Sequence, residues 1–188
     1  MMIGSKDLTL IIMFAVLNLV LVGLIGQIPE LVTGIPAIGY AFIIFYAITG
    51  SIALLMYQGR RWRLLTQSLL FNLLAIFLIR IYTPIAAIVS ILTAFIIDTV
   101  FNSCHGIFKR KNKLVWWATL SQLYSWTSQP IWTLLFVSIF LVPFEAVVRT
   151  WFIPVILVSF PMIIIEAIAG AYIGHRIFRK IENFSSAT

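Results

Sequence analysis

Residues 64–104 read LLTQSLLFNLLAIFLIRIYTPIAAIVSILTAFIIDTVFNSC, which is two long apolar runs with only Thr83 between them. A helix needs about 20 apolar residues to cross the hydrocarbon of a bilayer, and each run is about that long. Four further runs of this kind flank the pair. The sequence therefore predicts an all-α polytopic membrane protein with six transmembrane helices, at about residues 8–26, 35–57, 64–82, 84–104, 114–142 and 152–177. These spans fill most of the 188 residues, so we expect one transmembrane domain over residues 1–188.

The composition excludes several classes of protein. Apolar side chains make up 62% of the chain and charged side chains only 10%, against about 45–50% and about 25% in soluble domains. A soluble enzyme, a nucleic-acid binder and a disordered tail are therefore disfavoured. Transmembrane strands are disfavoured as well, because barrel strands are about ten residues long and alternate polar with apolar residues. The single cysteine, Cys104, excludes an intrachain disulfide.

The distribution of Lys and Arg predicts the orientation. Loops on the cytoplasmic side of a membrane protein carry an excess of these residues. Eleven of the thirteen fall on one side of the six predicted spans, and only Arg80 and Arg149 fall on the other. Both termini should then be cytoplasmic in a multi-pass protein of the cell membrane. The eleven residues are Lys6, Arg60, Arg61, Arg63, Lys109, Arg110, Lys111, Lys113, Arg176, Arg179 and Lys180.

Two carboxylates fall within the predicted spans. An ionisable group there is costly and usually faces the interior of the bundle. Asp98 shares a face of its helix with the small residues Ala86, Ser90 and Ala94, and such a face lets a neighbouring helix approach closely. Glu166 precedes a second set of small residues, Ala167, Gly170, Ala171 and Gly174. Each carboxylate either binds a cationic or donor-rich solute or makes a hydrogen bond between helices.

The predicted helix 114–142 carries a polar stripe. Gln122, Ser125, Gln129 and Trp132 lie on one helical face, and Pro130 should kink the helix. Facing lipid, such a stripe would be costly. Facing the interior, it supplies donors, acceptors and an indole for stacking, which suits a pocket for a small heteroaromatic solute. The alternative is that the stripe only joins helices by hydrogen bonds.

The segment Gly26–Tyr40 has three glycines and two prolines and is too apolar for a plain solvent loop. We expect it to fold over an outward cavity as a lid. No Walker loop, no His-Glu-x-x-His and no Gly-x-Ser-x-Gly occurs, so no catalytic or metal-binding constellation is evident. We expect no cofactor.

The layout resembles the substrate-binding S components of energy-coupling factor (ECF) transporters. The resemblance rests on six helices in under 200 residues, the apolar outer loop after the first helix, and a last helix reading IEAIAGAYIGHR at residues 165–176 with a basic tail. It implies capture of a vitamin or vitamin precursor from outside. It also implies partners, a coupling transmembrane protein and two ATPase subunits, which hydrolyse the ATP that drives import.

The resemblance also implies site residues. The pocket would lie between the first outer loop and helices four to six, with a thiamine-like ligand, and would use Glu30, Tyr40, Gln122, Trp126, Gln129, Trp132, Glu166 and Asp98. The coupling protein would dock on helix one at Ala15 and Gly23. The family often has alanines spaced by four there, whereas Leu19 follows Ala15 here. Nickel and cobalt members begin with Met-His, whereas this chain begins Met1-Met2, so metal import is disfavoured.

Two other functions fit the sequence. A membrane-embedded enzyme would use Asp98 or Glu166 as general acid or base, but it would also need a nucleophile or metal that the sequence does not show. A structural or assembly protein would need no ligand, and its polar stripe would only hold helices together.

Overall fold

A computed structural model of the chain describes residues 3–22, 32, 43–78, 84–140 and 153–187. These residues form helices and no strand, which confirms the predicted all-α class for this part of the chain. The helices are α1 (Ser5–Leu21), α3 (Ile44–Tyr57), α4 (Arg63–Leu78), α5 (Pro84–Ile96), the π-helix η3 (Ile97–Phe101), α6 (Asn102–Arg110), α7 (Leu114–Phe140) and α9 (Ile153–Ala187).

The segments α5, η3 and α6 follow one another without a break, so the described residues form six helical stretches. Two parts of these stretches, Pro84–Arg110 and Phe160–Phe184, are long and apolar enough to cross a membrane. This is weak support for a membrane protein, and the six crossings stay a prediction.

Several helices run past the ends predicted from hydropathy. The stretch from Pro84 ends at Arg110 rather than near residue 104, and α9 ends at Ala187 rather than near residue 177. The reason is that hydropathy marks where a chain would leave the hydrocarbon, whereas a helix continues wherever its backbone hydrogen bonds continue. Each extension contains two residues that are good helix formers, Lys109 and Arg110 in the first and Arg179 and Lys180 in the second. Likewise α7 runs through Pro130 without interruption.

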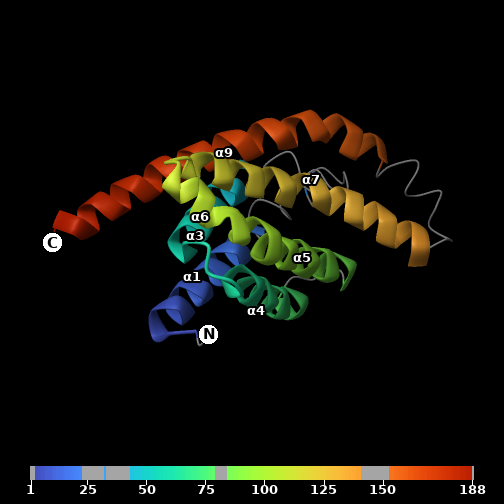
Figure 1. The fold of residues 1–188 in the computed structure, drawn as a ribbon. Helices are drawn as coiled ribbons and strands as arrows, with labels where there is room; N and C mark the ends of the chain where they lie inside the picture. Colours follow the sequence, from blue (N-terminus) through green and yellow to red (C-terminus); the bar gives the residue numbers. More distant parts are fainter. Residues whose placement is uncertain (1–2, 23–31, 33–42, 79–83, 141–152, 188) are drawn as a thin grey trace.

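The helices pack in two layers. Helix α9 lies along both α3 and α7, while α1 lies along α4 and α4 along α5 (Figure 1). Contacts of α5 with α7 and of α1 with α3 join the layers. The predicted small-residue face of α5 meets α4, where Ser90 Oγ lies 3.1 Å from Ser68 Oγ and accepts a 3.2 Å hydrogen bond from Asn72 Nδ2.

Glycines allow α9 to approach α3 closely. A Cβ built on Gly170 would lie 2.5 Å from Ala47 Cβ, and one built on Gly174 would lie 2.7 Å from the Ile48 carbonyl oxygen. No larger side chain fits between the backbones at these points. The small-residue set that follows Glu166 in the sequence therefore forms the contact with α3, as such residues do between membrane helices.

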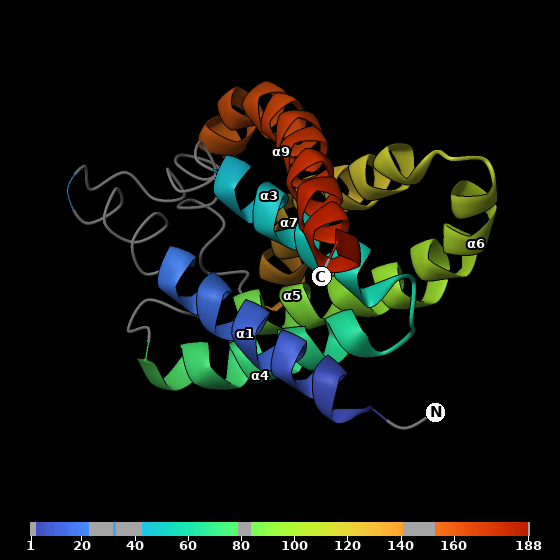
Figure 2. The same ribbon diagram turned by 90° about the vertical axis from the view of Figure 1, so that its left-hand side faces the viewer.

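One end of the bundle, hereafter the basic end, holds residues 5–7, 58–63, 103–113 and 175–187. Polar contacts link these segments, because Arg60 pairs with Asp7, Arg61 Nη2 donates to Ser103 Oγ at 3.0 Å, and Arg179 Nη2 reaches Asn112 Oδ1 at 3.4 Å. Figure 2 views the bundle from this end.

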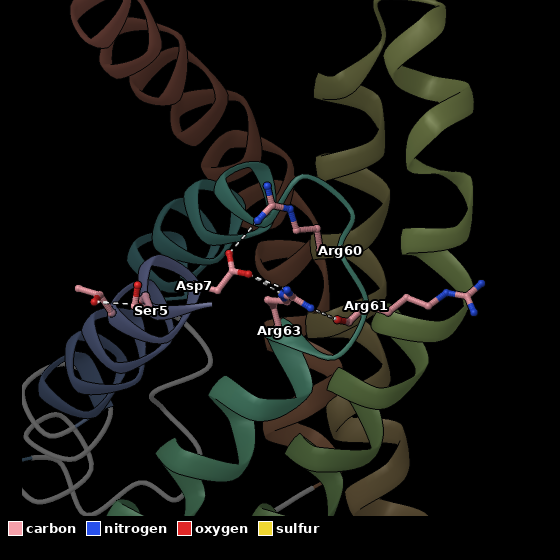
Figure 3. Close-up of polar contacts among 6 residues, drawn as sticks. Ser5, Asp7, Arg60, Arg61 and Arg63 are labelled. Atoms are coloured by element: carbon pink, nitrogen blue, oxygen red, sulfur yellow. Dashed lines mark hydrogen bonds and ion pairs between the residues drawn. The ribbon is translucent and has the colours of Figure 1, made fainter. Parts of the chain in front are cut away.

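A buried ion pair joins α1 to α4 at the basic end. Arg63 Nη2 lies 2.6 Å from Asp7 Oδ2, and Arg60 Nη1 lies 2.9 Å from Asp7 Oδ1 (Figure 3). Arg63 is 2% exposed and also donates to the Arg61 carbonyl at 3.0 Å. Hydrogen bonding from the Arg63 guanidinium holds the pKa of Asp7 below its ordinary value of 3.8. Asp7 is therefore charged at neutral pH and ties the start of α1 to the loop before α4.

Candidate functional site

The first element of the candidate site is the contact between Glu166 and the first turn of α3. The Glu166 Oε2 atom accepts a 3.0 Å hydrogen bond from the backbone N–H of Ile44, the first residue of α3. No side-chain cap comes from Ile43, the residue that precedes α3. A helix start has free N–H groups and a partial positive charge. The carboxylate of α9 therefore supplies the cap of another helix, and the helix start compensates part of its charge.

An aromatic pair packs on the same buried cluster as the residues that flank Glu166. Tyr46 of α3 and Trp126 of α7 have ring centroids 5.4 Å apart, with planes inclined by 47°. Both rings pack on the buried cluster of Ile43, Ile163 and Ala167. Since Ile163 and Ala167 lie on α9 immediately around Glu166, the rings and the carboxylate belong to one junction of α3, α7 and α9. We call this junction the α3–α7–α9 site.

Gln122 completes the site on α7. Its Oε1 atom accepts a 3.1 Å hydrogen bond from Trp126 Nε1, which fixes the orientation of the indole. Its Nε2 atom faces Gly50, where a Cβ would lie only 2.8 Å away. Gln122 is 4% exposed, so its amide is buried between α7 and α3. The predicted inward orientation of the polar stripe is confirmed for Gln122.

Asp98 belongs to η3, and its carboxylate contacts the start of α4. Its Oδ2 atom accepts a 2.7 Å hydrogen bond from the Leu65 backbone N–H, and its Oδ1 atom accepts a 2.6 Å bond from Asn102 Nδ2. Asp98 is fully buried, as the sequence predicts. Like Glu166, it caps a helix other than its own. Its two hydrogen-bond partners, Leu65 and Asn102, lie on α4 and α6 rather than on α3, α7 or α9.

The π-helix η3 positions Asp98. Its wider turn changes the direction of side chains along the stretch from α5 to α6. The Phe101 carbonyl, at the end of η3, accepts a 2.9 Å hydrogen bond from Trp117 Nε1 of α7. Trp117 is 1% exposed, so this bond is shielded from solvent.

The remaining predicted site residues fall into three groups. Gln129 and Trp132 lie half-buried on α7, beyond Trp126 along the helix. Ala15 is fully buried against Phe71 and Ala75 of α4. The residues Glu30, Tyr40 and Gly23 lie outside the described residues, as does the predicted lid Gly26–Tyr40 apart from Val32.

Sequence reasoning missed Tyr46 and Gly50. Both lie in the uniformly apolar run 35–57, where no polar periodicity marks one residue above another. Only the approach of α3 to α7 shows that Tyr46 faces Trp126 and that Gly50 makes room for Gln122.

The site offers two aromatic faces, an amide and a carboxylate within an apolar surround. This set suits a flat, partly apolar solute with a cationic or donor group. In the described residues, no three His, Cys, Asp or Glu side chains gather as a metal site requires. Comparison with family models, with curated proteins and with solved structures found no match to this chain.

Proposed function

We propose that this chain is the membrane-embedded substrate-binding subunit of an ATP-driven importer in the cell membrane. It has six transmembrane helices with both termini in the cytoplasm, and it captures a small heteroaromatic, thiamine-like solute from outside. The observation that carries the proposal is the α3–α7–α9 site, where Gln122, Trp126 and Glu166 converge from two helices. These are three of the residues that the resemblance to S components implies for the pocket.

The contacts at the basic end support the proposed topology. The sequence assigns the N-terminus, the two loops around residues 60 and 111, and the C-terminal part of α9 to the cytoplasm. Ion pairs and hydrogen bonds join these segments at one end of the bundle. A chain with one crossing more or fewer between them would bring some of these segments to opposite ends.

In the proposed mechanism the solute stacks on the Trp126 ring and displaces part of its contact with Tyr46. Gln122 holds the indole by the Nε1 hydrogen bond and so keeps the stacking surface in place. Glu166 supplies the negative charge for a cationic ring. Release into the cytoplasm requires a coupling transmembrane protein and two ATPase subunits, because the chain has no P-loop of its own.

The test is a thermal-shift screen of the purified protein against a panel of vitamins, with thiamine and its pyrimidine precursor as the first probes. A ligand that binds only the folded state raises its apparent stability. For the ligand found, Trp126→Ala should weaken binding by about 1–3 kcal/mol, the usual loss for a buried aromatic anchor. Trp116→Ala is the matched control, because Trp116 lies on the same helix and is 59% exposed.

The variant Glu166→Gln distinguishes an effect of the Glu166 charge on ligand binding from an effect on the stability of the fold. The Gln amide oxygen still accepts from the Ile44 N–H, so the cap of α3 is kept while the charge is lost. Weaker binding of a cationic ligand with unchanged thermal stability supports the proposed role of Glu166. Equal affinity of wild type, Trp126→Ala and Trp116→Ala for the ligand would exclude the α3–α7–α9 site as the pocket.

A structural role is the second candidate, and one observation favours it. Glu166 and Gln122 already have partners within the chain, the Ile44 N–H and the Trp126 indole. In a ligand-free assembly protein these bonds would serve only to hold helices together. A vitamin panel without any stabilising ligand, combined with loss of thermal stability in Trp126→Ala, is the result that this function predicts.

A further inference from the structure

Helix α9 is longer than a membrane crossing needs. Its 35 residues span about 52 Å at 1.5 Å per residue, whereas the hydrocarbon core is about 30 Å thick. About 15 residues therefore lie beyond the hydrocarbon. Figure 1 shows the C-terminal part of α9 projecting past the other helices at the basic end.

An apolar strip runs along this projecting part. Ile173, Ile177 and Ile181 follow one another at intervals of four, so they share one face of the helix. They are 37%, 38% and 44% exposed. A second face beside the strip carries the exposed cations Arg176, Arg179 and Lys180. The segment is thus amphipathic, with a strip of isoleucines and a basic edge.

Among the described residues, no ion pair neutralises the cations of the basic edge. The Arg176 guanidinium lies 5.0 Å above the Tyr172 ring, and Arg179 reaches only the neutral amide of Asn112. The ion pairs in the described part of the chain involve Asp7 alone as the acid. Glu182 is the one acidic residue after Glu166, so the segment 173–182 carries three cations against one carboxylate. The contact with Asn112 also brings this edge to the basic loop at residues 109–113.

We propose that residues 173–182 form an amphipathic anchor that extends from the acyl chains into the headgroup layer of the cytoplasmic leaflet and binds anionic phospholipid. The isoleucine strip then meets acyl chains, and Arg176, Arg179 and Lys180 meet lipid phosphates. At 1.5 Å per residue, residues 173–182 cover about 14 Å along the helix axis, which is enough to reach from the acyl chains through a headgroup layer about 5–8 Å thick. Basic amphipathic segments next to a membrane span bind anionic lipid in this way.

The inference rests on the membrane placement proposed above and not on the identity of the ligand. A failed vitamin screen therefore leaves it standing. If the full-length protein did not insert into nanodiscs at all, the membrane placement would fail, and that outcome is visible before either test below.

The first test measures depth. In full-length protein carrying Cys104→Ser, which removes the one native thiol, a spin label is placed at Ile181→Cys or at Glu182→Cys. The two sites are neighbours in sequence but point about 100° apart on the helix. In nanodiscs of phosphatidylcholine with phosphatidylglycerol, the label at 181 should be shielded from a water-soluble relaxation agent and the label at 182 should be accessible. Equal, high accessibility at both sites overturns the anchor and leaves the strip in water or for a protein partner.

The second test measures lipid selectivity. Spin-labelled phosphatidylglycerol should associate with the wild-type protein more strongly than spin-labelled phosphatidylcholine. Replacement of Arg176, Arg179 and Lys180 by Gln should lower this preference at least about fivefold, the effect of one cation near an anionic surface. Lys6→Gln, an exposed cation at the same end but on α1, should leave most of the preference. Unchanged selectivity in the triple variant, with unchanged thermal stability, contradicts the proposal.

Discussion

The close contact of α9 with α3 predicts the effect of one added methyl group. In Gly174→Ala the new Cβ would lie 2.7 Å from the Ile48 carbonyl oxygen and 2.9 Å from Ser51 Cβ, whereas ordinary contacts begin at 3.4 Å. The helices must separate by about 0.7 Å to restore an ordinary distance. The atom in the way belongs to the backbone, so no side-chain rotation relieves the contact.

The expected magnitude follows from two opposing effects. Overpacking a close contact costs about 1–3 kcal/mol. Replacement of a helical glycine by alanine returns about 0.5–1 kcal/mol, because glycine loses more backbone entropy on folding. We expect a net destabilisation of about 1–2 kcal/mol, or roughly 2–8 °C in the melting temperature for a chain of this size. Two turns away, the same separation should weaken the bond between Glu166 and the Ile44 N–H.

The assay is thermal unfolding in detergent, followed by tryptophan fluorescence at a fixed scan rate. Gly106→Ala is the matched control, because Gly106 is also helical and nothing lies within 4 Å of its added Cβ. This variant should be as stable as the wild type or slightly more stable. If Gly174→Ala were as stable as Gly106→Ala, the close packing of α9 on α3 would be refuted.

Substitutions at Asp7 and Asp98 test two further contacts between helices. Asp7→Asn should lower stability by about 1.5–3 kcal/mol, since it removes a charged acceptor from buried Arg63. Because the folded pKa of Asp7 is depressed, its contribution is full above the ordinary value of 3.8 and is lost as pH falls through the folded pKa. The stability difference between wild type and Asp7→Asn should thus be constant from neutral pH to about 4 and shrink below it; a difference that already disappears between pH 7 and 5 would count against the Asp7–Arg63 pair. Asp98→Ala should cost about 0.5–2 kcal/mol through the lost cap of α4, and Asp98→Asn less, because an amide oxygen still accepts from the Leu65 N–H; equal stability of Asp98→Ala and wild type in the same melting assay would show that the cap is not needed.

The sequence predicted the helices well because helix formation in an apolar run depends on residues within about one turn of each other. The same local rule predicted that Ser90 and Asp98 share an inward face. Contacts between helices follow no such period. Asp7 and Arg63 are 56 residues apart, and Glu166 and Ile44 are 122 apart.

From the amino-acid order alone came the all-α class, the six apolar runs, the asymmetry of charge and the polar stripe of α7, since each depends on composition or on neighbours along one helix. Tertiary structure alone decided which helix start each carboxylate caps, that Tyr46 faces Trp126, and that Asp98 is separate from the α3–α7–α9 site. These outcomes depend on how helices are ordered and rotated in the bundle. That arrangement is set by close packing at positions such as Gly50, Gly170 and Gly174, where the absence of a side chain leaves no hydropathy signal to identify the partner.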